Sequence, residues 1–459
     1  MCNCFIAFLG NNQYVGCNYY LEDDKSKKVD NVKFIQEALV RIFCCDWSKD
    51  DKILIFTTNE AKKVNWSDPS GLKKRLLKLE LKCSIENIEI PTASTETEMW
   101  DIYKILIDSI PDRSTIIFDI THSFRYQPVL ATTALNYLKV IKDVRLKGIY
   151  YGAFEKLGNI EKVKKLDFKD RNAPILNLTP AHVIQDWARA VNIFAETGRS
   201  HLISKLGIEN IKPILKEARG RDATLKKLDI VFKRIEKISK NIETCRIPEI
   251  LDEDFDSLKD DLKSLKDQKY VIQFNPVLDN LLDIFSKFKS NDIMNGFECV
   301  RLCIRYGLTQ QGYTFLREMI ITYILQKMGY RYDNPEEKLS YFLNRDVREH
   351  ISKCISELAT TITKESQIQP ISEHVSTCSS ELANEKNSNK IKEITEKFSK
   401  LKKSNKLYEL AKIYKNKIIT KRNDLNHGGF SHNNQRDIFK TLVCDYEETI
   451  NTIELLEYV

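Results

Sequence analysis

The chain has 459 residues, of which 42% are hydrophobic and 30% charged, so it can bury ordinary cores in two or three domains and is not disordered as a whole. Its formal net charge is +7, from 72 Lys and Arg against 65 Asp and Glu, which is too diffuse to indicate a partner. Glycine (15) and proline (11) are scarce, which favours long helices and excludes a turn-rich all-β protein.

No apolar run reaches the roughly 18 residues needed to span a bilayer. The N-terminal residues lack the basic segment and cleavage site of a signal peptide. The sequence therefore predicts a cytoplasmic protein with no membrane partner. The twelve cysteines show neither a disulfide framework nor zinc-site spacing, so we expect reduced thiols and no bound metal.

The first part of the chain alternates short apolar runs with helical patterns. Near-continuous apolar runs are typical of strands that are covered on both faces, and they occupy residues 3–9, 52–56, 114–118 and 146–151. Helical patterns occupy 32–43, 96–110 and 126–141. This alternation predicts parallel βαβ units in a Rossmann-like, doubly wound α/β domain over residues 1–178.

The strand pattern disappears after about residue 180, and residues 179–459 are predicted to be all-α. Apolar residues at spacings of three and four predict a helical hairpin at about 221–268. Further helices are expected at 275–306, 309–329, 391–421 and 435–456. The polar stretch 360–389 is weakly patterned and indicates a surface insertion whose role is open.

Polar and small residues follow three of the predicted strands. Ligands of open α/β sheets bind at this carboxyl edge. No G-x-G-x-x-G or G-x-x-x-x-G-K-[ST] motif occurs, which disfavours a dinucleotide cofactor and P-loop chemistry. A nucleotide could still bind through amides, hydroxyls and a cation. The alternative is structural, with Asp119 and Thr121 capping the next helix and Arg125 a surface charge.

The sequence Arg422-Asn423-Asp424-Leu425-Asn426-His427 closes the predicted helical run and precedes two glycines. An Arg and a His at this spacing suit metal-independent RNA cleavage, because the 2′-OH of the RNA supplies the nucleophile. His427 would act as general acid or base, Arg422 would neutralise the phosphate in the transition state, and Asn423 would orient one of them.

A second R-x-x-x-x-H match, Arg345 to His350, contains Asp346 and Glu349. We interpret it as a solvated helix face, because these carboxylates could neutralise its arginines. On an ideal helix a five-residue offset separates two side chains by about 140°. Arg422 and His427 would therefore need a distorted helix end or a second copy across a two-fold axis, and we expect a dimer.

The local charge points to the same end of the chain. From Lys386 to Arg422 there are 12 Lys and one Arg against three Glu, so this stretch carries +10 (13 − 3). Such a run is often only a solvated helix face, but here it leads into the Arg–His motif. We predict that it guides RNA phosphates through Lys397, Lys400, Lys402, Lys403 and Lys406.

The chain resembles the CRISPR-associated CARF–HEPN ribonucleases of type III CRISPR defence. Residues 119–125, Asp-Ile-Thr-His-Ser-Phe-Arg, are similar to the D-[IV]-T-H-x-F-R signature of CARF domains. Arg422-Asn423-x-x-x-His427 is similar to the R-N-x-x-x-H motif of HEPN domains, and residues 306–318 resemble a HEPN helix beside the active site. The two motifs occur in the expected order.

The resemblance implies a homodimer that binds a cyclic oligoadenylate, with cyclic tetra-adenylate as the expected ring, and then cleaves single-stranded RNA without metal. Ser123 replaces the glycine usual in the signature, which leaves the ring size open, as is assembly beyond a dimer. The implied catalytic residues are Arg422, Asn423 and His427. The implied ligand residues are Gly10, Asn11, Asn12, Thr57, Thr58, Thr121, His122, Ser123 and Arg125.

Two other functions remain open from the sequence. The chain could be a nucleotide-responsive regulator whose helical domain binds RNA or a partner without cutting it. Alternatively, the α/β domain could degrade its own ligand, with Thr121 and His122 as candidates for that chemistry.

Overall fold

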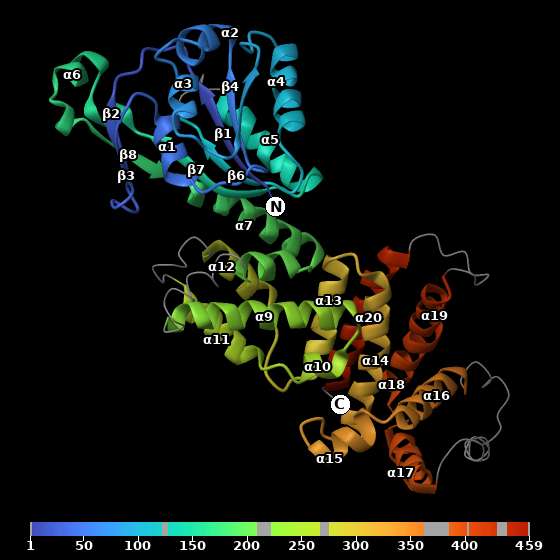
Figure 1. Ribbon diagram of the computed structural model, residues 1–459. Helices are drawn as coiled ribbons and strands as arrows, with labels where there is room; N and C mark the ends of the chain where they lie inside the picture. Colours follow the sequence, from blue (N-terminus) through green and yellow to red (C-terminus); the bar gives the residue numbers. More distant parts are fainter. Residues whose placement is uncertain are drawn as a thin grey trace. The chain divides into compact units, whose positions relative to one another are not determined.

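The computed structural model of the chain describes residues 2–121, 127–208, 222–266, 275–361, 385–401, 404–428 and 438–457. It divides into two compact units, Met1–Gln185 and Asp186–Val459. The division falls inside helix α7 (Thr179–Thr197), which begins just after the predicted domain boundary at residue 178. The first unit is α/β and the second is helical, so the predicted fold class is confirmed (Figure 1).

The α/β unit contains one eight-stranded sheet in the order β3-β2-β8-β7-β6-β1-β4-β5. The strands β5, β4, β1, β6 and β7 are mutually parallel. Strand β8 is antiparallel to β7, and β3 is antiparallel to β2. The bounds are β1 Asn3–Leu9, β2 Cys17–Leu21, β3 Lys28–Val32, β4 Lys52–Thr57, β5 Ser84–Glu89, β6 Thr115–Asp119, β7 Arg145–Gly152 and β8 Asn172–Asn177.

Helices cover both faces of this sheet, as the apolar runs predicted (Figure 1). Alternate residues of β1 point to opposite faces. Phe5, Ala7 and Leu9 join the core under α1 (Ile35–Phe43) and α3 (Leu72–Leu77). Cys4, Ile6 and Phe8 join the core under α4 (Glu96–Ser109) and α5 (Gln127–Ile141).

Four strands were not predicted, namely β2, β3, β5 and β8. Strands β3 and β5 form the two edges of the sheet, where one face or both stay partly exposed and the sequence is mostly polar. Strand β8 contains Pro174, which argues against a strand from sequence alone. The predicted parallel sheet is therefore extended by an antiparallel edge.

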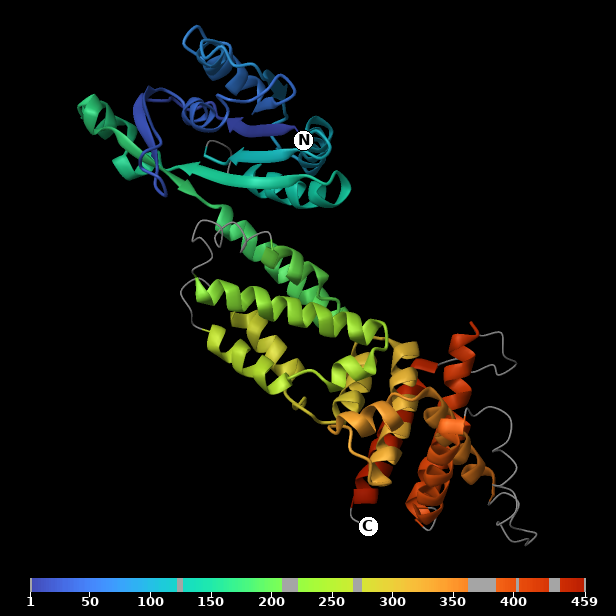
Figure 2. The same cartoon turned by 60° about the horizontal axis from the view of Figure 1, so that its bottom comes forward.

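The helical unit begins with the remainder of α7 and continues with α9 (Ala223–Glu243), which packs along α11 (Phe255–Leu265). Figure 2 shows α9 and α11 side by side, with α12 (Asn275–Ile284) next to them. A short helix, α10 (Ile247–Leu251), lies in the connection of the predicted hairpin. The predicted helix 275–306 is in fact two helices, α12 and α13 (Asn295–Arg305).

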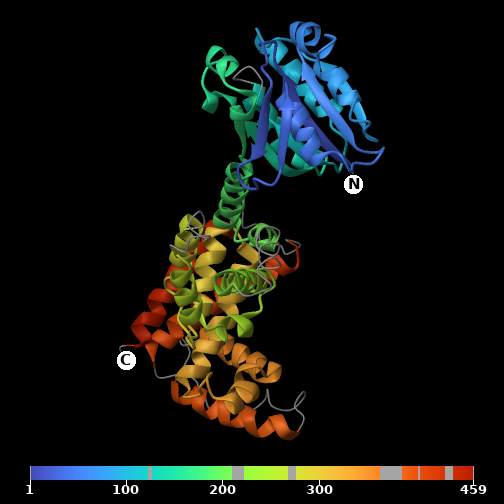
Figure 3. The ribbon, with the colours of Figure 1, turned by 60° about the vertical axis from the view of Figure 1, so that its left-hand side comes forward.

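Helix α14 (Thr309–Lys327) contacts α13, α16 (Arg345–Thr361), α19 (Thr420–Asn426) and α20 (Ile438–Glu457), and α17 (Glu385–Leu401) packs on α16. In Figure 3 the orange α16 and the red-orange α17 lie against each other. The predicted helix 391–421 is a succession of shorter helical segments. The bounds are α15 Pro335–Glu337, α16 Arg345–Thr361, α17 Glu385–Leu401, α18 Asn405–Ile413, the π-helical turn Tyr414–Ile419, α19 Thr420–Asn426 and α20 Ile438–Glu457.

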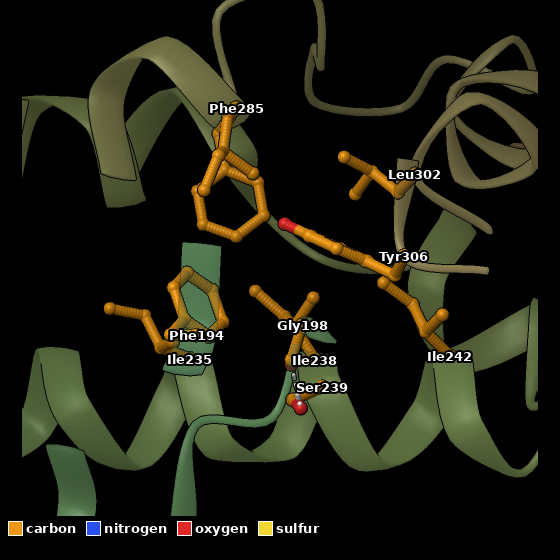
Figure 4. Close-up of a pocket in the computed structure, with 10 residues that line it drawn as sticks. Phe194, Gly198, Ile235, Ile238, Ser239, Ile242, Phe285, Leu302 and Tyr306 are labelled. Atoms are coloured by element: carbon orange, nitrogen blue, oxygen red, sulfur yellow. Dashed lines mark hydrogen bonds between the residues drawn. The ribbon is translucent and has the colours of Figure 1, made fainter. Parts of the chain in front are cut away.

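A small cavity lies inside the helical unit between α7, α9, α12 and α13 (Figure 4). Its volume is about 10 Å³, which holds about one water molecule. The ring of Tyr306 forms one wall, and its hydroxyl has no hydrogen-bond partner among the described residues. A Cβ at Gly198, whose φ is +69°, would lie 2.6 Å from this ring, so glycine is needed there. The cavity is a packing gap and is too small for a ligand.

In the part of the chain that the structure describes, no helix has both the length and the hydrophobicity to cross a membrane. The eleven cysteines in the described ranges are free thiols.

Candidate functional site

The described members of the predicted ligand set lie at the carboxyl edge of the parallel strands. Leu9 of β1 lies beside Thr57 of β4, and Ala7 lies beside Asp119 of β6. The order β5-β4-β1-β6-β7 places the topological switch point between β1 and β6. Open α/β sheets bind their ligands at such points, so the loops after β1 and β6 form the candidate ligand site.

The loop after β1 is held by hydrogen bonds from an asparagine, Asn65, that the sequence patterns did not indicate. Asn65 is 3% exposed and lies in the π-helical turn Lys62–Trp66. Its amide donates to the carbonyls of Gly10 (2.8 Å) and Asn12 (2.9 Å). The Gly10 amide donates to the hydroxyl of Tyr14 at 3.0 Å. These bonds fix the loop 10–14, and only the tertiary structure brings Asn65 to it.

The predicted ligand residues on this side of the site differ in accessibility. Asn11 is exposed and donates to Glu60 at 2.7 Å. Thr57 is fully buried, and its hydroxyl accepts from Asn87 at 2.9 Å. Thr58 is 6% exposed, and its hydroxyl caps α2 (Asn59–Ala61) by accepting from Ala61 at 3.3 Å. Both threonine hydroxyls therefore serve the fold, while Gly10, Asn11 and Asn12 face the edge of the site.

A buried carboxylate lies at the end of β6. Asp119 is 0% exposed, and its Oδ1 accepts from the amide (2.9 Å) and the hydroxyl (2.5 Å) of Thr121. The Thr121 hydroxyl in turn accepts from the Gly152 amide at 2.8 Å. Burial raises the pKa of Asp119 to about 7, against the opposing effect of the Thr121 bonds and of Gln36. These bonds position Thr121. The alternative that Asp119 and Thr121 cap the next helix concerns a helix start outside the described residues and stays a prediction.

Three predicted ligand residues, His122, Ser123 and Arg125, lie outside the described residues. Lys402 and Lys403 of the predicted RNA-binding set do so as well. Their roles stay predictions.

The Arg–His motif forms the end of α19 in the helical unit. Arg422 is half-buried, and Asn423, Asn426 and His427 are exposed, so the group is accessible to a large substrate. His427 is the C-terminal cap residue with φ −93° and ψ 12°, and its amide donates to the Asn423 carbonyl at 2.9 Å. Gly428 follows with φ +66°, as expected for the residue that ends a helix.

A buried ion pair ties this helix end to the core of the unit. Lys421 Nζ lies 2.6 Å from Asp445 Oδ2 of α20, and the two side chains are 9% and 4% exposed. The hydroxyl of Tyr313 on α14 also donates to Asp445, at 2.9 Å. Lys421 is thus a structural residue and not part of an exposed phosphate surface.

The described lysines of the predicted RNA-binding set are in different environments. Lys397 pairs with Glu393 at 3.0 Å and lies 3.9 Å from the ring centroid of Tyr330. Lys406 pairs with Glu409 at 3.0 Å. Lys400 is exposed and forms no ion pair within the described residues. The +10 stretch is therefore less available to RNA than its charge suggests.

The second Arg–His match is a structural part of α16. Arg345 pairs with Glu349 at 2.8 Å on the surface, as predicted. The interpretation as a wholly solvated face is wrong, because Arg348 turns inward and pairs with Glu318 of α14 at 2.7 Å. His350 Nε2 lies 2.9 Å from the hydroxyl of Thr395, and burial lowers its pKa. The side chains of Arg345, Arg348 and His350 are therefore engaged in contacts within the protein.

Among the described residues, no group of three or more His, Cys, Asp or Glu side chains converges in a way that could hold a metal ion.

Among the comparisons with known proteins, the family model concerns the first part of the chain. Residues 4–155 match the family model of the CARF domain of the CRISPR system endoribonuclease Csx1. The CRISPR-associated protein MJ1674 of Methanocaldococcus jannaschii is 28% identical over 337 residues, which are 72% of this chain and 44% of that protein. The chain thus matches less than half the length of this curated relative.

A solved structure, Enterococcus italicus Csm6 bound to cyclic hexa-2′-fluoro-hexa-dAMP, covers 99% of this chain and 94% of its own chain, at 12% identity and a TM-score of 0.40. The family-model match and the curated relative confirm the predicted resemblance to CARF-containing CRISPR-associated proteins. The family model covers the α/β domain, and the HEPN resemblance of the helical unit stays a prediction.

Proposed function

We propose that the protein is a cyclic-oligoadenylate-activated endoribonuclease that cleaves single-stranded RNA in type III CRISPR antiviral defence. The observation that carries this proposal is the combination of a domain that matches a CARF model with an accessible Arg422 and His427 at a helix end of the following unit. A dimer that completes the catalytic site from two copies is part of the proposal.

The proposed chemistry needs only groups of the protein and of the RNA. The 2′-OH attacks the adjacent phosphorus, the bond to the 5′-oxygen of the next nucleotide breaks, and a 2′,3′-cyclic phosphate forms. His427 moves the proton as general base or acid. Arg422 stabilises the additional charge on the phosphate oxygens in the transition state. Asn423, whose Oδ1 accepts from Arg422 at 3.3 Å, helps to orient the guanidinium.

Activation follows from linkage between two sites. A cyclic oligoadenylate bound at the loops after β1 and β6 stimulates cleavage only if it binds the active arrangement of the dimer more tightly than the resting one. The backbone amides, the amide side chains and Thr121 at that edge are the polar groups that such a ligand requires. The fixed geometry of loop 10–14, held by Asn65, supports a preformed site.

The test is RNA cleavage with cyclic tri-, tetra- and hexa-adenylate, each added to single-stranded RNA. We expect one ring size to stimulate cleavage and His427→Ala to lower the stimulated rate by about 100-fold or more. His350→Ala serves as the matched control and should cleave at nearly the wild-type rate. If no ring stimulates cleavage, or if His427→Ala cleaves as well as the wild type, the proposal is wrong.

The same experiment separates the two alternative functions. A regulator without nuclease activity would shift RNA in a binding assay and leave it intact. Degradation of the ligand by the α/β domain would appear as loss of the cyclic oligoadenylate over time.

A further inference from the structure

The guanidinium of Arg422 is held by neutral amide groups. The side chain of Asn426 lies against it; with the Asn426 amide assigned so that its oxygen faces the guanidinium, this oxygen accepts from Nε at 2.9 Å and from Nη2 at 3.1 Å. Asn423 accepts from Nη1 at 3.3 Å. Within the described residues, no carboxylate forms an ion pair with Arg422. The arginine is therefore oriented by its neighbours while it keeps its full charge.

The chemistry of arginine sets the direction of this contact. A guanidinium has only donors, so the oxygen of Asn426 faces Arg422 and its NH2 group faces away. That NH2 group lies 3.1 Å from the side-chain amide of Gln310. The Gln310 atom at this distance is Nε2, and two donors do not bond, so we assign the Gln310 amide with its oxygen toward Asn426. The hydrogen bonds thus run in one direction, from Arg422 to Asn426 to Gln310, and we call this chain of three side chains the relay.

Gln310 connects this relay to a rigid part of the unit. It lies in the first turn of α14, and Tyr313 and Leu316 of the same helix are fully buried. Arg422 lies on α19, which the Lys421–Asp445 pair attaches to α20. The relay therefore joins the guanidinium to α14, a second support that α19 itself does not provide.

The other Arg–His match shows what a different acceptor would do. Arg345 pairs with the carboxylate of Glu349 at 2.8 Å, which cancels much of its charge toward an approaching phosphate. Amide oxygens orient a guanidinium through their dipoles and leave its net charge unchanged. This difference separates Arg422 from Arg345, although both precede a histidine by five residues.

We propose that Asn426 and Gln310 are positioning residues for Arg422, and that they hold its guanidinium in the orientation that contacts the scissile phosphate. This inference rests on the proposed ribonuclease function and adds two residues to its machinery. Gln310 lies more than a hundred residues from the Arg–His motif in the sequence, and Asn426 occupies a position that the R-N-x-x-x-H pattern leaves free.

The first test measures kcat and KM of ligand-stimulated RNA cleavage for Asn426→Ala and Gln310→Ala. Loss of one orienting hydrogen bond should lower kcat about tenfold, with a smaller change in KM, because Arg422 remains present for ground-state binding. Asn416→Ala is the matched control, since Asn416 is exposed in the preceding π-helical turn and its side chain forms no hydrogen bond with the other described residues. Wild-type kcat in both relay variants would overturn the inference.

A second test uses the direction of the relay. Gln310→Glu keeps an acceptor for the Asn426 NH2 group, whereas Gln310→Lys offers only donors. If only charge mattered, the lysine variant would cleave anionic RNA better. The relay predicts the opposite order, with the glutamate variant nearer to wild-type kcat, and a faster lysine variant would contradict it.

The proposed ribonuclease function and the relay can be disproved separately. If Arg422→Ala and His427→Ala retain stimulated cleavage, the proposed function itself is wrong. If those two variants lose activity while the Asn426 and Gln310 variants keep the wild-type kcat, only the relay is wrong. Melting temperatures of all variants should match the wild type, because Asn426 and Gln310 are exposed.

Discussion

At the scale of single residues, Asp119 is the clearest case of a side chain whose role depends on its surroundings. Its Oδ1 accepts two bonds from Thr121, while its Oδ2 is buried without a partner among the described residues. The nearby phenols of Tyr14 and Tyr19 are also buried, and burial raises the pKa of each. A neutral carboxylic acid suits this environment better than a carboxylate.

The raised pKa predicts a particular pH dependence of stability. The ordinary pKa is 3.8 and the folded value is about 7. The folded protein therefore holds this proton more tightly than the unfolded chain does. The stabilising contribution is complete below about pH 4 and is lost as the pH rises to about 7. Above pH 7, Asp119→Asn should be more stable than the wild type by a few kcal/mol, at about 1.4 kcal/mol per pKa unit.

Urea unfolding of the wild type and of Asp119→Asn at pH 5 and pH 8 tests this. Asparagine keeps an acceptor for Thr121, and any cost of the NH2 group where Oδ2 lies is the same at both pH values, so it cancels in the comparison. The stability difference between the two proteins should change in favour of the variant at pH 8. Parallel pH profiles would show that Asp119 does not titrate in this range.

At the scale of secondary-structure elements, the position of α19 depends on a buried ion pair. Lys421 and Asp445 join α19 to α20, and Tyr313 of α14 donates to the same carboxylate. Removal of one partner from a buried pair leaves a charge without compensation. The pair therefore fixes the helix end that carries Arg422 and His427.

Lys421→Met should destabilise the protein by about 3–5 kcal/mol, because Asp445 stays buried without its cation. The double variant Lys421→Met/Asp445→Leu should recover much of that loss, since no buried charge remains. Denaturant unfolding of both variants measures the effect. The exposed pair Lys417–Glu448 serves as control, and Lys417→Met should cost at most about 1 kcal/mol. Equal losses at positions 421 and 417 would contradict this account.

At the scale of the whole molecule, the positive net charge of +7 comes from one part of the chain. The stretch from Lys386 to Arg422 carries +10 in sequence, but the structure pairs several of its lysines. Lys397 is engaged by Glu393 and Tyr330, and Lys421 is buried with Asp445. We therefore predict that phosphate attraction depends on exposed cations such as Lys400 and on Arg422.

RNA binding at several salt concentrations distinguishes these lysines. In a His427→Ala background, which prevents cleavage, Lys400→Gln should make the slope of log K against log salt shallower by about 0.7, the value for one phosphate contact with a single strand. Lys397→Gln should leave the slope nearly unchanged and lower the melting temperature, because the contact with Tyr330 is lost. Equal slopes for Lys400→Gln and the wild type would exclude Lys400 from the RNA surface.

Much of the fold could be predicted from the sequence, because apolar runs and apolar spacings along the chain indicate its buried strands and its helices. The strand 3–9 was predicted with its full bounds, and the helices 96–110 and 126–141 within one residue at either end. The edge strands β3 and β5 were missed, since an edge strand is partly exposed and lacks a continuous apolar run. The predicted helix 391–421 is divided into α17, α18, a π-helical turn and α19. The sequence did not indicate these boundaries, because the apolar spacing continues across them.

For the candidate sites, the sequence by itself determined the two motifs, their order along the chain and the candidate residues for nucleotide binding and RNA cleavage, whose roles stay predictions. Only the tertiary structure decided which lysines are engaged, and which of the two R-x-x-x-x-H matches has an arginine without an ion pair to any carboxylate of the described residues. It also decided that Asn65 supports the loop after β1 and that Gln310 reaches Asn426. The physical reason is that a motif records neighbours along the chain, whereas burial, ion pairing and hydrogen bonding depend on neighbours in space.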